Sequence, residues 1–135
     1  MQRDRMQHAS IVGFLSGTLS PEALAYEIVT EVAAFRMALR TTANGNIVVT
    51  DGPQFVVTKE GARRLLEAVA DERLPFDTAN YIADCIVMND DFDFADDAAR
   101  DAVFFIEDDS GRFVAQGDNW RPTRAEILAA LALLD

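Results

Sequence analysis

The chain is short of the residues on which most enzymes and metal sites depend. Its 135 residues include one cysteine, Cys85, and one histidine, His8. A single cysteine excludes an internal disulfide, and these two residues alone cannot complete a zinc site within one chain. A nucleophilic site with a histidine base would have to use His8, which we expect to be solvated beside a frayed amino terminus, residues 1–7. Cys85 lies in an apolar stretch and is predicted to pack in the core.

Two further absences exclude nucleotide and membrane ligands. The seven glycines form neither a P-loop nor a G-x-G-x-x-G motif, so no phosphate-binding loop and no cofactor are predicted. No apolar run approaches the roughly 20 residues of a membrane-spanning helix, and no signal peptide is recognisable. Together with the single cysteine, these observations predict a cytoplasmic protein without a membrane partner.

Negative charge is abundant and unevenly distributed. The chain has 23 acidic and 12 basic residues, a net charge of −11, which argues against nucleic acid and favours a basic partner. Residues 1–83 contain ten acids and eight bases, whereas residues 84–118 contain eleven acids and two arginines. Nearly all of the excess therefore lies in one quarter of the sequence.

Apolar periodicity and capping signals predict one mainly α (α+β) domain of five to six helices over residues 1–135. The clearest helix begins at Ser20-Pro21-Glu22, where a capping hydroxyl, a proline and an acid near the helix dipole coincide. We expect this helix to continue to about Arg40. Other helices are predicted near Ile11 and after Thr58, Asp77, Asp96 and Thr123.

Two runs of β-branched and aromatic residues predict a small β-hairpin. The runs, 47–50 and 55–58, are separated by the turn sequence Asp51-Gly52-Pro53. Because a two-stranded ribbon alone is marginal in water, the hairpin must pack on the helices. The stretch 89–95 is predicted to be an acidic turn between two helices.

Acidic residues without a capping role are the candidates for a binding site. Asp96 and Asp97 are explained by the start of a helix, because carboxylates stabilise that end of the helix dipole. Asp84 is a carboxylate on an otherwise apolar helix, where it marks a solvated stripe, pairs with an arginine or belongs to a contact site. The acids that we predict to face a partner are Asp84, Asp90, Asp91, Asp93, Glu107, Asp108 and Asp109.

The spacing of the same acids does not match that of a calcium-binding loop. Counting a calcium-binding loop from Asp91 places Ala95 and Ala102 at positions 5 and 12, where oxygen ligands are needed, so the register fails. No metal site is therefore assigned. Asp90, Asp91 and Asp93 remain the alternative, as ligands of another divalent ion or as paired carboxylates of a hydrolase.

Aromatic residues beside this charge are candidate anchors for a partner, since aromatic side chains carry much of the binding energy at interfaces. Each of them could equally belong to the core. The candidates are Tyr81, Phe92, Phe113 and Trp120. Trp120 lies in a polar loop and is predicted to be the most exposed of the four.

Four sequence blocks, between Phe55 and Leu134, occur in a characteristic order. They are Thr58-Lys-Glu-Gly-Ala-Arg-Arg-Leu-Leu-Glu-Ala-Val, Asn80-Tyr-Ile-Ala-Asp, Asp90-Asp-Phe-Asp-Phe and Pro122-Thr. In this order they resemble small bacterial immunity-type proteins, the antidotes encoded beside polymorphic or contact-dependent inhibition toxins. The stretch 107–121 is longer than the loop expected there. The resemblance implies a mostly helical, non-catalytic protein that binds a toxin stoichiometrically.

Three hypotheses follow for the function. The first is an acidic protein-binding module that neutralises a basic toxin by stoichiometric binding, without catalytic residues. The second is a small metal-binding or hydrolytic protein that uses Asp90, Asp91 and Asp93. The third is a structural or oligomerisation domain, for instance a homodimer, whose acidity serves solubility.

Overall fold

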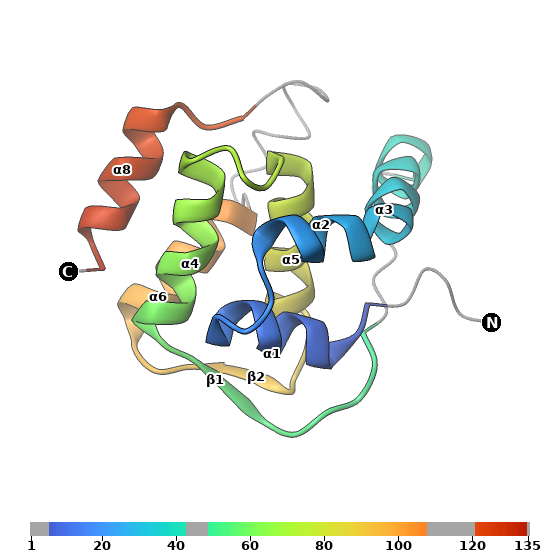
Figure 1. The fold of residues 1–135 in the computed structure, drawn as a ribbon, viewed down its shortest axis with the longest axis horizontal. Helices are drawn as coiled ribbons and strands as arrows, with labels where there is room; N and C mark the ends of the chain where they lie inside the picture. The colour runs from blue at the N-terminus through green and yellow to red at the C-terminus, as the bar shows by residue number, and fades with distance from the viewer. Residues whose placement is uncertain (1–5, 43–48, 108–120, 135) are drawn as a thin grey trace.

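The computed structural model describes residues 6–42, 49–107 and 121–134, with the backbone alone for residues 38–42. These residues form seven helices and two three-residue strands (Figure 1). The protein is mainly helical with a small two-stranded parallel sheet, which confirms the predicted fold class. The helices are α1 (His8–Ser16), α2 (Pro21–Glu27), α3 (Val29–Thr42), α4 (Lys59–Ala70), α5 (Phe76–Val87), α6 (Asp97–Glu107) and α8 (Arg124–Ala132), and the strands are β1 (Phe55–Val57) and β2 (Phe92–Phe94).

Helices α4 and α5 form the centre of the fold. Helix α5 contacts α3, α4 and α6, while α4 also contacts α1, α6 and α8 (Figure 1). Nine of the twelve residues of α5 are buried, which confirms that this apolar helix is surrounded. Fully burying a large apolar side chain stabilises the fold by roughly 1.5–3 kcal/mol. The largest buried side chains of this core include Phe14, Phe35, Leu65, Leu66, Tyr81 and Ile82.

Three of the predicted helix starts are confirmed by their capping hydrogen bonds. The Ser20 hydroxyl accepts from the N–H of Ala23 at 3.1 Å, and Thr58 caps α4 through the N–H of Gly61. A reciprocal capping box opens α8, where the side chains of Thr123 and Glu126 each bond the other's backbone N–H. Each such cap stabilises its helix by about 1 kcal/mol, because it satisfies an N–H that the helix leaves without a partner.

The helix predicted from Ser20 to Arg40 is interrupted. It ends at Ile28 and continues as α3, although Ile28 remains buried. The break falls where Ile28, Val29 and Thr30 follow one another, and three consecutive β-branched side chains lower helix propensity. Helix α5 also differs from the prediction, because it begins at Phe76, after Pro75 as N-cap, so that Asp77 lies in its first turn.

The predicted β-hairpin is wrong. Strand β1 pairs with β2 in parallel, with Phe55 opposite Phe92, Val56 opposite Asp93 and Val57 opposite Phe94. Strand β2 lies within the stretch that was predicted to be an acidic turn. Of the first run, 47–50, only Val49 and Thr50 are described, and Val49 forms an isolated parallel bridge with Met6.

The turn sequence fails to reverse the chain because Gly52 has other contacts. A Cβ on Gly52 would lie 2.1 Å from Nδ1 of His8, so the glycine backbone packs directly on the imidazole ring. The N–H of Gly52 donates to Oδ2 of Asp91 at 3.4 Å. The same imidazole stacks on the ring of Phe92, with the two ring centroids 4.8 Å apart. His8 and Asp91 therefore hold the chain before β1 against β2.

The amino-terminal predictions need a correction at two residues. Residues 1–5 lie outside the described part, but Met6 is fully buried and pairs with Val49 rather than fraying. His8 is 3% exposed rather than solvated, and its backbone N–H donates to Oγ1 of Thr50 at 2.9 Å. Its burial follows from the stacking on Phe92.

Candidate protein-binding surface

Five of the eight predicted partner-facing residues fall within the described structure. They are Asp84, Asp90, Asp91, Asp93 and Glu107, whereas Asp108, Asp109 and Trp120 lie outside it. We call residues 84–107 the acidic segment, which runs from the last turns of α5 through β2 to the end of α6. It contains eight carboxylates and one arginine.

The carboxylates around β2 bond polar groups rather than cations. Asp90 is exposed, while Asp91 is half-buried and accepts the N–H of Gly52. Asp93 is exposed and accepts from Nε2 of Gln54 at 2.8 Å. Hydrogen bonds to neutral donors leave the formal charge of these side chains in place. This part of the acidic segment therefore keeps its negative charge at the surface.

The carboxylates at the start of α6 lie closer to cations than those around β2. Oδ1 of Asp96 accepts the N–H of Ala99 at 2.9 Å, which confirms its predicted role in capping α6. Its other oxygen lies 3.9 Å from Nζ of Lys59. Arg100 lies 3.4 Å from Asp97 and 3.4 Å from Asp101. These exposed pairs contribute little to stability, because solvent screens them and the long side chains lose rotamer freedom.

Asp84 and Glu107 form a hydrogen-bonded pair of carboxyl groups between α5 and α6. Burial raises the pKa of Asp84, and the hydrogen bond to Glu107 opposes that rise. Asn80 holds the end of α6 in place, since its Nδ2 donates to the carbonyl oxygens of residues 106 and 107, both at 3.0 Å. The predicted solvated stripe at Asp84 is thus a half-buried contact between two acids.

The acidic segment does not gather its carboxylates for a metal ion. Within residues 6–42, 49–107 and 121–134, no three side chains of His, Cys, Asp or Glu approach closely enough to hold one. Asp91 and Asp93 direct oxygens to Gly52 and Gln54 instead. Cys85 is fully buried, and burial raises the pKa of its thiol, so its predicted role in the core is confirmed.

Two of the four candidate aromatic anchors take the other alternative and belong to the core. Tyr81 is 1% exposed and Phe92 is 5% exposed, while Phe113 and Trp120 lie outside the described residues. Sequence reasoning missed the apolar side chains that are exposed beside the acids, Val56 at 48% and Met88 at 71%. The alternation of β1 could have identified Val56, since successive strand residues face opposite sides.

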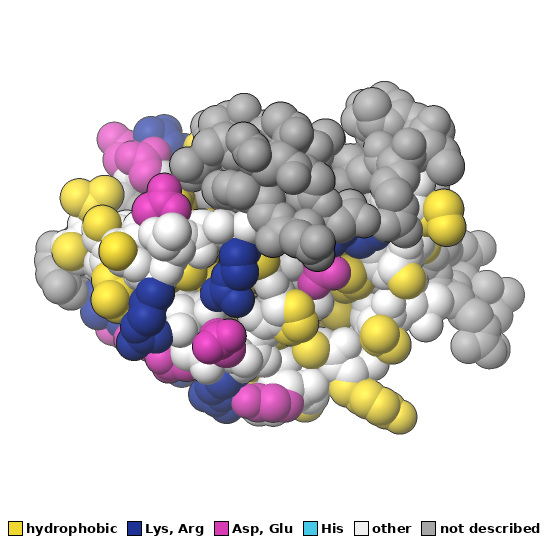
Figure 2. Space-filling view, turned by 90° about the horizontal axis from the view of Figure 1, so that it is seen from above, with side chains coloured by type: hydrophobic (Ala, Val, Ile, Leu, Met, Phe, Trp, Pro, Cys, Tyr) yellow, Lys and Arg dark blue, Asp and Glu magenta, His cyan; other side chains and the backbone are white. Residues whose placement is uncertain are grey.

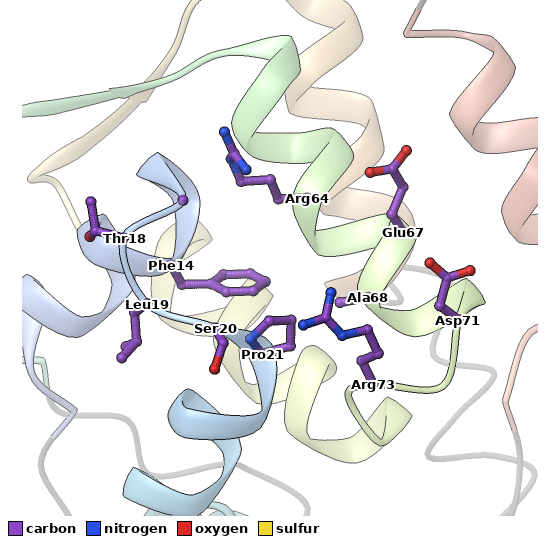
Figure 3. A pocket seen from close by; sticks show the side chains of 11 residues that line it. Phe14, Thr18, Leu19, Ser20, Pro21, Arg64, Glu67, Ala68, Asp71 and Arg73 are labelled. Carbon is purple, nitrogen blue, oxygen red and sulfur yellow. The ribbon is translucent and has the colours of Figure 1, made fainter.

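A hollow of about 430 Å³ lies elsewhere, between α4 and the turn from α1 to α2 (Figure 3). Phe14, Pro21 and Ala68 contribute apolar surface to it. Its polar lining combines cations with anions, namely Arg64, Glu67, Asp71 and Arg73. No histidine or cysteine is among its lining residues.

The ion pairs near this hollow neutralise most of its charge. Arg73 donates to both carboxylate oxygens of Glu22, at 2.7 and 2.9 Å, and lowers the pKa of Glu22 to about 2. Arg124 lies 3.9 Å from Asp71, and Arg121 lies 3.8 Å from Glu72. Figure 2 shows the face seen from above, where basic and acidic side chains lie next to one another. The hollow thus carries a balanced charge, unlike the acidic segment.

None of the helices formed by the described residues is both long and apolar enough to cross a membrane. In comparisons with known proteins, no family model, no curated protein and no solved structure matches the chain.

Proposed function

We propose that the protein is a non-catalytic module that binds a basic protein through the acidic segment, in the manner of an immunity protein occluding a basic toxin. One observation carries the proposal. Three of the eight carboxylates of the acidic segment, Asp96, Asp97 and Asp101, lie within ion-pair distance of Lys59 or Arg100, whereas Asp90, Asp91 and Asp93 pair with no cation among the described residues. A surplus of like charge destabilises the compact chain by self-repulsion, and a cationic partner would remove that cost.

The chemistry of the segment supports recognition rather than catalysis. Asp90 and Asp93 are exposed and bonded to no cation among the described residues, so they are available to charged donors of a partner. The two residues most often used as base or nucleophile, His8 and Cys85, are 3% and 0% exposed. An acidic surface of this kind accelerates association with a basic protein, and salt reduces the effect.

The test is capture of a partner by three forms of the protein. The first is the wild type and the second is Asp90→Asn/Asp91→Asn/Asp93→Asn. The control is Glu60→Gln/Glu67→Gln/Glu72→Gln, which makes the same change in net charge elsewhere. Glu60 and Glu67 lie on α4, and Glu72 follows shortly after its end. The forms are immobilised and exposed to lysate of the organism that encodes the chain, at low and high salt.

We expect the wild type and the control to retain a basic protein that elutes as the ionic strength rises, and the Asn variant to lose it. Mass spectrometry identifies the retained protein and its isoelectric point. Retention by all three forms, or retention of acidic proteins alone, would contradict the proposal. Circular dichroism checks that the variants are folded.

Self-association is a second candidate, because one face of α2 and α3 exposes large apolar residues. Tyr26 is 86% exposed and Val29 is 62% exposed. They flank Ile28, the residue at which α2 ends and after which α3 begins. Sedimentation of the wild type and of Tyr26→Glu tests this candidate. A dimer that the substitution dissociates supports it, whereas a monomer at all concentrations excludes it.

A further inference from the structure

Strand β1 has an inner and an outer face. Phe55 and Val57 lie partly or fully inside the protein, whereas Val56 between them is 48% exposed. The neighbouring strand repeats the pattern, with Phe92 buried and Asp93 exposed opposite Val56. The outer face of the ribbon therefore presents one apolar and one negatively charged side chain next to each other.

The backbone of β1 also has a side that no described residue pairs. The N–H of Phe55 donates to the carbonyl of Asp91, and the carbonyl of Val57 accepts from Ala95, both at 2.9 Å. Because N–H and C=O alternate in direction along a strand, those of Val56 point away from β2. No backbone group of the described residues bonds to them. In Figure 1, β1 forms the lower boundary of the fold, with no described element beyond it.

A ribbon of two short parallel strands is an incomplete sheet. Parallel strands usually occur in larger sheets that are covered on both faces, and two strands alone are marginally stable in water. An exposed strand edge is a template for an extended segment of another protein, which adds main-chain hydrogen bonds. Val56 supplies a donor and an acceptor that no backbone group of residues 6–42, 49–107 and 121–134 occupies.

The charge around the ribbon identifies the segment that fits. Asp93 lies on the outer face, and Asp90 and Asp91 immediately precede β2. Asp51, in the chain before β1, is exposed as well. An added strand would lie about 4.8 Å from β1, so a lysine or arginine side chain extended across Val56 approaches Asp93. The complementary occupant is an extended segment with basic side chains on alternate residues.

We infer that the protein binds its partner by accepting an extended basic segment of that partner as a third strand along the free edge of β1. This inference rests on the proposed function and specifies how the acidic segment engages the partner. Main-chain hydrogen bonds at Val56 provide affinity, and Asp93 with its acidic neighbours selects for basic side chains.

Two peptide probes of equal charge test the inference. One alternates lysine and valine over eight residues and readily extends. The other alternates lysine with glycine and proline and cannot form a regular strand. Their affinities are measured by calorimetry for the wild type and for Asp90→Asn/Asp91→Asn/Asp93→Asn, and amide exchange of Val56 is followed by NMR.

We expect the lysine–valine peptide to bind the wild type at least about tenfold more tightly, a difference of about 1.4 kcal/mol, and to protect the Val56 amide. Equal binding of both peptides that is lost in the Asn variant overturns strand addition and leaves the proposed function standing. Failure of both peptides to bind, or equal binding to the wild type and the Asn variant, overturns both proposals.

A pair of substitutions tests whether the peptide forms main-chain hydrogen bonds with Val56. Val56→Pro removes the N–H donor, whereas the control Val56→Thr keeps both backbone groups and a β-branched side chain. We expect only the proline variant to lose its preference for the lysine–valine peptide. Because the proline could unfold the ribbon, the same peptide N-methylated on alternate residues is tested on the wild type. Undiminished binding of the methylated peptide in every register overturns the inference.

Discussion

The acidic residues in two regions of the protein have partners of opposite kinds. On the side of α2 and α4, each of three carboxylates lies beside an arginine from a distant part of the chain, as in Arg73 with Glu22. In the acidic segment, Asp84 is bonded to another acid, Glu107. The pKa of Glu22 is lowered, while the pKa of Asp84 is raised. The first arrangement joins elements of the fold through opposite charges, whereas the second joins α5 to α6 through two acids.

The largest effect is expected at Arg36, the most buried cation among the ion pairs of the described residues. Its side chain is 11% exposed and lies 3.3 Å from Asp77. Asp77→Asn keeps an oxygen for the N–H of Thr78 but leaves the buried charge without this counterion. We expect a loss of about 2 kcal/mol in the free energy of unfolding, measured with urea. Arg36→Met combined with Asp77→Asn should recover most of it, and failure to recover would show that the charge is not the cause.

Asp84→Asn should change stability in the opposite direction. The amide keeps a hydrogen-bonding group beside Glu107 but removes one of two adjacent carboxyl groups, so we expect a gain on the order of 1 kcal/mol at neutral pH. The pH dependence follows from the raised pKa of Asp84, since the folded state binds the proton more tightly. The wild type should lose this contribution as pH rises from the ordinary value of 3.8 through the folded pKa. Urea unfolding from pH 3 to 8 should show the slope in the wild type and a smaller one in the variant.

Glu72→Gly compares two contributions to the free energy of unfolding, that of an exposed ion pair and that of a strained backbone conformation. Glu72 follows α4 at a φ of 58°, a left-handed conformation in which glycine is favoured. Its partner Arg121 is 3.8 Å away, and both side chains are exposed. We expect a gain of about 0.5–1 kcal/mol despite the lost pair. Glu72→Ala is the control, because it removes the same pair without relieving the backbone, and it should not stabilise.

The smallest effect on stability is expected at Arg73, where a pKa is the better readout. In Arg73→Met the pKa of Glu22 should return from about 2 towards its ordinary value of 4.5, as measured by NMR titration. A group with a lowered pKa stabilises the fold above its unfolded pKa, so this contribution is lost as pH falls from 4.5 towards 2. An unchanged Glu22 titration in the variant would show that the two-bond pair does not persist in solution.

Local signals in the sequence were sufficient for most of the helices. Ser20, Thr58, Asp96 and Thr123 satisfy backbone groups within three residues of themselves, so their roles depend on short segments alone. The apolar stretch around Cys85 likewise predicted its burial in α5. The break at Ile28 was missed because one apolar stripe continues through it, from Leu24 to Phe35.

The ribbon and its surroundings could not be predicted in this way. Gly52 occurs in a sequence typical of a tight turn, whereas in the structure it contacts the distant side chains of His8 and Asp91. The burial of His8 likewise depends on Phe92. For the candidate binding surface, composition identified the acids, but it gave no indication that Asp84 would meet Glu107.

The parallel register of β1 and β2 has a consequence for the order in which the molecule assembles. The two strands are connected by the whole of α4 and α5, so their pairing closes a long loop that contains both helices. Closing so long a loop costs chain entropy that a few hydrogen bonds offset only late in folding. We therefore expect the ribbon to be the last element to form and the first to open, with the fastest amide exchange among the paired segments.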